Sequence, residues 1–253
     1  PPPPPPPAPP PPPPPPGPKP GKMCTHRHLV ANETIDWRTA GGVTQVKDQG
    51  QCGSCWSFST TGAVEGAWFV AGNPLVALSE EELVQCDNGA DEGCDGGLMD
   101  NAFEFIMKIG GITSEELYPY VSGNGTTGTC KARLVKTKVA HISDFCDLIP
   151  KNETDLELAL NQQPVAVAIE ADQGAFQFYE GGVIPAKKCG TSLDHGVLAV
   201  GYGFDAKHKM KYWTVKNSWG AKWGEDGYVR IQKSPKKGHS GCGIAEDASY
   251  PVV

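Results

Sequence analysis

Two cysteines three positions apart, Cys52 and Cys55, are the part of this sequence best suited to chemistry. A thiol pair at this spacing serves zinc binding, disulfide redox chemistry or nucleophilic catalysis. A zinc site requires a second closely spaced pair of Cys or His residues, and the next cysteines, Cys86 and Cys94, are too far apart to supply one. A thioredoxin-like redox motif follows a strand, whereas residues 43–50 form a polar stretch typical of a loop. Nucleophilic catalysis is therefore the hypothesis to follow along the chain.

A cysteine nucleophile requires a base, and the base requires a partner that orients it. The sequence offers His195, in the run LDHGV, and Asn217, in the run KNSWG. Taken singly, Cys55 could be a disulfide partner, His195 a core histidine, Asn217 a turn cap and Gln49 a solvated loop residue. The four residues together favour a catalytic site.

These runs resemble those of the papain-like cysteine peptidases, and most closely the cathepsin L-like endopeptidases. The resemblance extends from about Thr34 to Val253. The blocks that carry it, in family order, are IDWR at 35–38, QGQCGSCW at 49–56, GCDGGLMD at 93–100, YPY at 118–120, QPV at 163–165, LDHGV at 193–197, KNSWG at 216–220 and WGEDGY at 223–228. Any one block could arise by chance, but the ordered set could hardly do so.

The resemblance implies a role for each candidate catalytic residue. Cys55 would be the nucleophile, with its thiol pKa lowered by the start of a helix and by His195 as an imidazolium. Asn217 would accept the second ring N–H of His195, and Trp219 would lie over that hydrogen bond and exclude water. Gln49 would donate to the oxyanion of the tetrahedral intermediate beside the backbone N–H of Cys55. No metal or cofactor is expected.

The resemblance also implies a cleft for extended polypeptide substrates. Gly96 and Gly97 match the family's substrate-binding glycines, where a bare backbone can pair with the substrate main chain. Gly53, Asp194 and Trp219 are further expected cleft residues. By the same resemblance, the pocket for the side chain two before the cleaved bond has apolar walls and an acid, Asp247, at its base; the walls are Leu98, Met99, Ala168, Leu193 and Gly196. Leu, Phe, Val or Tyr should be preferred there, and Asp247 either allows Arg or is a solvated surface residue. No two-histidine occluding loop appears in the first lobe, so endopeptidase activity is expected.

Asp194 lies beside His195 and invites a Cys-His-Asp interpretation. Adjacent strand residues point to opposite faces, and the family uses the Asn, so we do not expect Asp194 in the triad. The other histidines are expected at the surface.

Nine cysteines indicate an oxidising compartment, because cytosolic proteins rarely keep disulfides. The resemblance implies three bridges, Cys52–Cys94, Cys86–Cys130 and Cys189–Cys242, with Cys55 free. Cys24 and Cys146 are then left over, and parity favours a fourth bridge between them. The alternative is that Cys24 pairs with another chain or with another part of a precursor.

The net charge of −7 argues against a nucleic-acid partner, and no apolar run approaches the roughly 20 residues that span a bilayer. Sequons at Asn32, Asn124 and Asn152 fit a secretory route and a lysosomal, vacuolar or secreted location. The sequence has no signal peptide and lacks the family's helical pro-region, so we expect a processed or excised product. The resemblance adds cystatin-type inhibitors and the chain's own pro-region as candidate partners of a monomer.

Residues 1–33 are expected to be a proline-rich arm or linker, followed by a catalytic domain at 34–253. Pro1–Pro20 cannot form helix or sheet and should adopt polyproline II, as a spacer or as a docking arm.

The elements that must position the candidate residues follow from periodicity. Apolar spacing predicts a helix over 55–70, ended by Gly72-Asn73-Pro74, and another over 99–109. Ser79 and Glu82 predict a capping box for a short helix between them. After Lys136 the sequence predicts strands at 165–169, 197–202, 212–216 and 227–231, with one helix at 153–160. The expected fold is α+β and papain-like: a helical first lobe, an antiparallel β-barrel-like second lobe, and the active site in the cleft between them.

A second hypothesis is a catalytically inactive binding or scaffold protein of the same fold, recruited through the proline-rich arm. The intact set of Cys55, His195, Asn217 and Gln49 argues against it. Covalent labelling of Cys55 by an inhibitor of cysteine peptidases distinguishes the two.

Overall fold

The computed structural model describes residues 22–24, 31–234 and 238–253. The predicted arm over residues 1–20 lies outside the described residues, as do two of the six histidines, His26 and His28. Three of the remaining histidines, His141, His208 and His239, are exposed, as expected.

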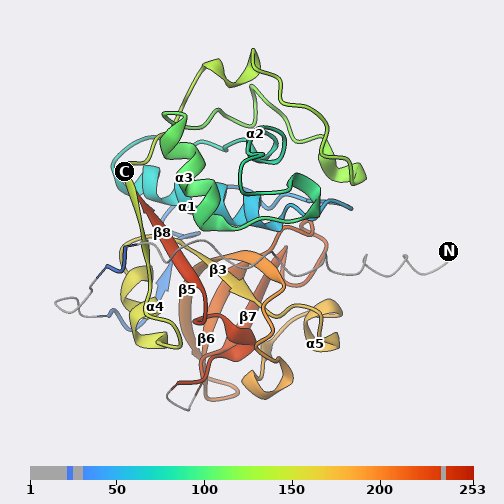
Figure 1. The fold of residues 1–253 in the computed structure, drawn as a ribbon. Coiled ribbons are helices and arrows are strands. Elements are labelled where there is room, and N and C mark those ends of the chain that lie inside the picture. Colours follow the sequence, from blue (N-terminus) through green and yellow to red (C-terminus); the bar gives the residue numbers. More distant parts are fainter. Residues whose placement is uncertain (1–21, 25–30, 235–237) are drawn as a thin grey trace.

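The first half of the chain forms a mainly helical lobe (Figure 1). Its helices are α1 (Cys55–Val70), α2 (Glu80–Cys86) and α3 (Met99–Lys108). Apolar side chains of these helices share one core with residues of the sheet, including Phe145, Ala166 and Leu198. The helices therefore pack directly onto the second lobe.

Helix α1 is buried on nearly every side, because it lies between the two lobes. Two glycines allow its close approach to the sheet. A Cβ atom on Gly62 would lie 2.8 Å from Leu198 Cδ2, and one on Gly66 would lie 2.5 Å from Pro164 Cγ. Ser59 Oγ also donates to the carbonyl oxygen of Val197 at 2.7 Å. The helix is thus fixed against the strand that carries His195.

Within the part of the chain that the structure describes, the second lobe is built on one sheet of eight strands (Figure 1). The strands are β1 (Ile35–Asp36), β2 (Asp144–Asp147), β3 (Val165–Ile169), β4 (Val183–Ile184), β5 (His195–Asp205), β6 (Met210–Lys216), β7 (Tyr228–Gln232) and β8 (Ala248–Val252). Their order is β2-β8-β3-β5-β6-β7-β4, and β1 pairs with β5. All pairs are antiparallel except β4 with β7. Helices α4 (Glu153–Leu160) and α5 (Gly174–Gln177) flank the sheet.

The α+β papain-like fold is confirmed, but the sheet is open rather than closed like a barrel. Among the described residues, the end strands β2 and β4 each pair with one strand only. The outer edge of β2 instead meets the N-terminal segment, where Met23 forms a parallel bridge with Asp147. The division into an arm at 1–33 and a catalytic domain at 34–253 stays a prediction.

The capping box predicted for α2 is half wrong. Ser79 Oγ does accept from the N–H of Glu82, at 3.0 Å. The carboxylate of Glu82, however, accepts from the N–H of Thr113 at 2.7 Å and pairs with Lys138. The N–H of Ser79 donates to the carbonyl oxygen of Thr113 instead, at 3.0 Å. The backbone of Thr113 thus provides the partners that the Glu82 carboxylate and the Ser79 N–H would have found in each other in a capping box.

Candidate active site

Cys55 is the first residue of α1 and is 7% exposed. The preceding Ser54 does not cap the helix with its side chain, since its hydroxyl is hydrogen-bonded to the hydroxyl of Tyr120 at 2.8 Å. The N–H of Gly196, in β5, donates to Cys55 Sγ at 3.4 Å. The thiol therefore lies at a helix start that lacks a side-chain cap, against the strand that begins with His195.

His195 and Asn217 are joined by a hydrogen bond of 2.8 Å between Nε2 and Oδ1. Oδ1 also accepts from the N–H of Ser218, at 2.8 Å, so this atom is the amide oxygen and Nε2 is the donor. The ring of Trp219 lies 5.0 Å from the imidazole, tilted by 30°. His195 and Asn217 are each 3% exposed. The other ring nitrogen, Nδ1, remains available to a thiol.

Gln49 is held by two hydrogen bonds that fix its side-chain amide. Its Nε2 donates to the carbonyl oxygen of Cys52 at 2.9 Å, and its Oε1 accepts from Ser218 Oγ at 2.6 Å. The amide nitrogen carries two hydrogens, so one further N–H remains. The residue is 4% exposed. An oriented donor with a free N–H beside the nucleophile suits an oxyanion hole.

Burial dominates the electrostatics of the thiol and the imidazole. It raises the pKa of the Cys55 thiol, against the lowering effect of the backbone N–H groups of Gly196 and Trp56. It lowers the pKa of His195 to about 4, against the hydrogen bond to Asn217. The raised thiol pKa is opposite to the sequence prediction, because the motif does not report how deeply both groups are buried. When the thiolate and the imidazolium form together, each serves as the counter-ion of the other. This attraction is absent when only one of the two groups is charged.

A cavity that is partly open to solvent is lined by Cys55 and His195, among other residues. Its lining contains the predicted cleft residues apart from Trp219: Gly53, Gly96, Gly97, Leu98, Met99, Ala168, Leu193, Asp194, Gly196 and Asp247. Trp219 covers the imidazole instead. A Cβ atom on Gly97 would lie 2.6 Å from Trp56 Cδ2 and 2.9 Å from Asp91 Cγ, so no larger residue fits there without a shift.

Both acids of the cavity have identifiable surroundings. Asp194 Oδ1 accepts from the N–H of Ala171 at 2.7 Å, while the imidazole of His195 is bonded to Asn217. Asp194 is thus engaged away from the imidazole, in the arrangement expected from strand alternation. Asp247 lines the cavity, and desolvation raises its pKa.

Four disulfides join Cys24–Cys146, Cys52–Cys94, Cys86–Cys130 and Cys189–Cys242, and Cys55 is the free cysteine. These are the pairings that the sequence analysis expects, the fourth among them. Cys52–Cys94 ties the loop before α1 to the segment before Gly96, and so joins the nucleophile's side of the cleft to its substrate-binding glycines.

The three sequons differ in their surroundings. Asn32 and Asn124 are exposed. Asn152 is partly buried and caps α4, where its side chain accepts from the N–H of Asp155 at 3.2 Å. Attachment of a glycan to Asn152 would have to accommodate this cap.

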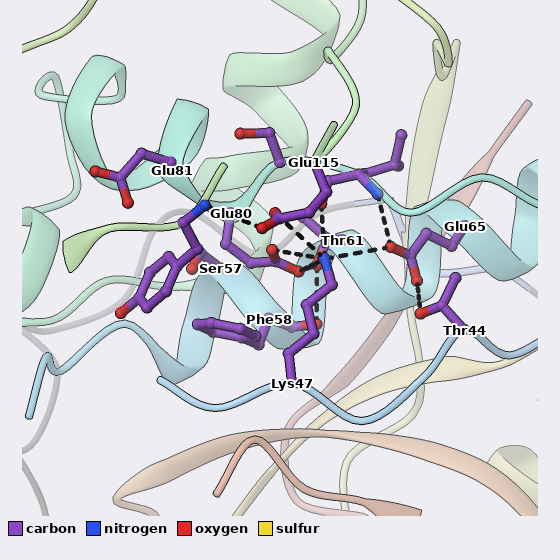
Figure 2. Close-up of polar contacts among 12 residues, drawn as sticks. Thr44, Lys47, Ser57, Phe58, Thr61, Glu65, Glu80, Glu81 and Glu115 are labelled. Carbon is purple, nitrogen blue, oxygen red and sulfur yellow. Dashed lines mark hydrogen bonds and ion pairs between the residues drawn. The ribbon is translucent and has the colours of Figure 1, made fainter. Parts of the chain in front are cut away.

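Further residues support the site although the sequence assigned them no role, and two of them, Ser218 and Tyr120, lie in the runs KNSWG and YPY. Ser218 and Tyr120 orient Gln49, since Tyr120 also donates to the Gln49 carbonyl oxygen at 2.9 Å. Lys47, two residues before Gln49, forms a buried ion pair with Glu80 at 2.7 Å (Figure 2). A run of glutamates at 80–82 ordinarily indicates an exposed helix face, so the sequence carries no signal for this burial.

Over residues 22–24, 31–234 and 238–253, no group of three or more His, Cys, Asp or Glu side chains could hold a metal ion. In the same part of the chain, no helix has the length and apolar character needed to cross a membrane.

The chain is similar to cysteine proteases of plants. Residues 31–252 match the family described as papain family cysteine protease. Cysteine proteinase COT44 of Brassica napus is 51% identical over 219 residues, which cover 87% of this chain and 65% of that protein. Bromelain of Ananas comosus, solved with the inhibitor E64, superposes with a TM-score of 0.81 at 41% identity, over 88% of this chain and 99% of bromelain. The ragweed allergen Amb a 11, solved as a proform, gives 0.85 at 40% identity, over 94% and 71% of the two chains. The present chain thus spans less than two thirds of the length of the Brassica protein.

Proposed function

Since the chain belongs to the papain family of cysteine proteases, we propose that it is a cysteine endopeptidase that hydrolyses extended polypeptides. One observation carries the proposal above the others. Cys55, at the start of α1 in the helical lobe, lines the same cavity as His195 of the second lobe, and His195 is hydrogen-bonded to Asn217. A scaffold protein would need none of this arrangement.

The chemistry follows from the geometry. Cys55 Sγ attacks the scissile carbonyl carbon as a thiolate, and His195 holds the proton on Nδ1. The oxyanion accepts from the free N–H of Gln49 and from the backbone N–H of Cys55. Collapse of the tetrahedral intermediate breaks the C–N bond, and the amine leaves with the proton from His195. Water then attacks the acyl-enzyme, His195 takes its proton, and the thiolate is released with the carboxylic acid.

Substrate preference is set by the apolar side of the cavity. Leu98, Met99, Ala168 and Leu193 favour Leu or Phe two residues before the cleaved bond. Asp247 also allows Arg there, and more so as the pH rises, because desolvation keeps part of its carboxyl protonated until higher pH. Comparison of kcat/KM for matched Phe and Arg peptides tests this. Asp247→Ala should lower the Arg-to-Phe ratio, and an unchanged ratio contradicts a role for Asp247.

Covalent labelling tests the proposed activity directly. The protein is treated with an epoxide inhibitor of cysteine peptidases of the E64 type and mapped by mass spectrometry. We expect a single adduct on Cys55, loss of cleavage of an unfolded protein substrate at internal bonds, and no adduct in the Cys55→Ser variant. Cys55→Ser should fold normally yet lose more than about 10³-fold in kcat/KM, because a hydroxyl does not ionise in this site. An unlabelled Cys55 in folded wild-type protein contradicts the proposal.

The remaining proposals concern the protein's setting. Disulfides and sequons support maturation in the secretory route and a vacuolar, lysosomal or secreted location. The proform of Amb a 11 supports an inhibitory pro-region for this chain, and we propose cystatin-type inhibitors and a monomeric state. The arm at 1–33 is proposed as a spacer rather than a docking ligand. Enzymatic deglycosylation with mass analysis tests glycans at Asn32 and Asn124.

A further inference from the structure

Figure 2 shows a group of charged side chains, Lys47, Glu65, Glu80 and Glu115, gathered around the Lys47 ammonium group. Lys47 Nζ donates to the two carboxylate oxygens of Glu80 at 2.8 and 2.7 Å, and to the carbonyl oxygen of Leu78 at 2.8 Å. Glu115 lies 3.6 Å from the same ammonium group. Glu80 is 1% exposed, so the lysine rather than water stabilises its charge. Thr61 Oγ1, on α1, donates to the same carboxylate at 2.6 Å.

A second set of contacts crosses between the lobes. Lys216 Nζ, from the last residue of β6, donates to Thr44 Oγ1 at 3.0 Å. Thr44 Oγ1 in turn donates to Glu65 Oε2 at 2.7 Å, on helix α1. Glu65 is 2% exposed, and its other oxygen accepts from the N–H of Leu78 at 2.8 Å. The hydroxyl of Thr44 therefore links the residue before Asn217 to the helix that begins with Cys55.

The backbone of the same segment is paired with the segment after Asn217. The carbonyl oxygen of Lys47 accepts from the N–H of Gly220 at 3.0 Å, and the N–H of Gln49 donates to the carbonyl oxygen of Ser218 at 2.8 Å. The backbone pairing of residues 47–49 with residues 218–220 therefore holds both Gln49, the proposed oxyanion donor, and the chain that follows Asn217. A shift of the 44–49 segment would displace both.

We propose that Thr44, Lys47, Glu65, Glu80 and Lys216 form a positioning network. It sets Gln49 and Asn217, which come from different lobes, in register with Cys55. The inference rests on the proposed peptidase function, because its effect is on that reaction. None of the five residues is among those that line the cavity beside Cys55, so they act through the residues they hold. The network should therefore affect turnover more than substrate binding.

The Thr44 hydroxyl provides the sharpest test, because it can be removed without a change of side-chain shape. Thr44→Val deletes the link, and Thr44→Ser keeps it. We expect Thr44→Val to lower kcat about tenfold with KM unchanged, since a small misplacement of catalytic groups is costly. Thr44→Ser should keep kcat close to that of the wild type. Each kcat is obtained as the maximal rate divided by the concentration of active sites, which is measured by titration with the epoxide inhibitor.

A matched ion pair in the same lobe separates positioning from general stability. Lys138 pairs with Glu82, which is as buried as Glu80, and the carboxylate of Glu82 is bonded to Lys138 and to the N–H of Thr113 rather than to residues 44–49 or 216–220. Lys47→Met and Lys138→Met should both lower Tm. Only Lys47→Met should lower kcat at a temperature where both are folded. If Lys47→Met does not fold, the two Thr44 variants decide.

The outcomes distinguish this inference from the proposed function. A tenfold loss in Thr44→Val, restored in Thr44→Ser and absent in Lys138→Met, supports the network. Unchanged kcat in Thr44→Val, or an equal loss in Lys138→Met, overturns it while the peptidase proposal stands. Wild-type protein that neither cleaves peptides nor takes up the inhibitor contradicts the function itself.

Discussion

At the scale of single residues, Cys55 is subject to two opposing influences. Burial disfavours its thiolate, whereas the start of α1, the N–H of Gly196 and a charged His195 all favour it. The mechanism requires the second group of influences to prevail when both residues charge together. The balance is measurable, because only the thiolate reacts with alkylating reagents.

We predict that Cys55 reacts with iodoacetamide already at about pH 6, where an ordinary thiol with a pKa of about 8.5 is almost unreactive. His195→Gln removes the counter-ion and leaves burial in control, so its alkylation rate should rise only above about pH 8.5. The measurement is the rate of alkylation against pH, followed by mass spectrometry. Superimposable profiles for the two proteins would show that His195 does not stabilise the thiolate.

A second residue-scale prediction concerns a buried acid pair beneath the substrate-binding glycines. Burial raises the pKa of Asp91, but its Oδ1 accepts from Asn101 Nδ2 and from the N–H of Leu98, both at 2.9 Å, and these bonds act in the opposite direction. Burial, and then the charge of Asp91, raise the pKa of Asp87 to about 8. A raised carboxyl pKa means that the folded protein holds this proton more tightly than the unfolded chain. Stability from Asp87 is therefore present at low pH and lost as the pH rises towards 8.

Asp87→Asn removes this dependence, because an amide stays neutral and can donate to Asp91 at every pH. The Tm of the variant relative to the wild type should therefore be more favourable at about pH 9 than at about pH 4.5. Thermal unfolding at both pH values checks this. Asp95→Asn, at an exposed acid of the same region, is the control and should show no such difference. If the difference in Tm between Asp87→Asn and the wild type is the same at both pH values, Asp87 does not hold a proton more tightly in the folded protein.

At the scale of elements, the packing of α1 on the sheet predicts an unusual response to a helix-favouring substitution. Gly66→Ala should gain about 1 kcal/mol in helix propensity but lose about 1–3 kcal/mol by overpacking against the Pro164 ring. Net destabilisation is expected in urea unfolding. Gly62→Ala should cost less, because its new methyl meets the end of the Leu198 side chain, which can rotate. A stabilised Gly66→Ala protein would show that the contact is looser than described.

The elements also show what the sequence can predict. Helix α1, helix α4 and strand β3 begin and end where periodicity places them, because their patterns and flanking residues are local. Strands β2, β4 and β8 were not predicted: β4 is two residues long, and Pro251 interrupts the pattern of β8. The second half of the capping box failed because Glu82 finds Thr113, which is distant in sequence. Long-range partners leave no local signature.

The same limit applies to the site. Cys55, His195, Asn217 and Gln49 were singled out because each lies in a recognisable run, and the structure brings them together with the cavity residues. The Lys47–Glu80 pair has no such run, and its glutamate stands in a sequence typical of exposed helices. Its burial arises from the packing of the 44–49 segment against α1 and α2, which the sequence does not report.

At the scale of the whole molecule, the N-terminal root is fixed to the edge of the sheet. Cys24 is bonded to Cys146 on β2, the N–H of Asp147 donates to the carbonyl oxygen of Lys22 at 3.2 Å, and Lys22 Nζ lies 3.3 Å from Asp144. We predict that peptide mapping without reduction recovers Cys24 linked to Cys146. A Cys24 peptide that is alkylated, or linked to any other cysteine, contradicts the bridge. Loss of the bridge in Cys24→Ser should cost several kcal/mol at most.

This bridge has a consequence for proteolytic trimming. A cut in the chain between Cys24 and Ile35 would leave the first 24 residues covalently attached to the sheet, although the peptide connection is lost. The severed piece would leave only on reduction, so the cut protein would keep its proline-rich end in an oxidising compartment and shed it in a reducing one. The redox state of the surroundings, rather than the protease that makes the cut, would then decide how long that end travels with the rest of the chain.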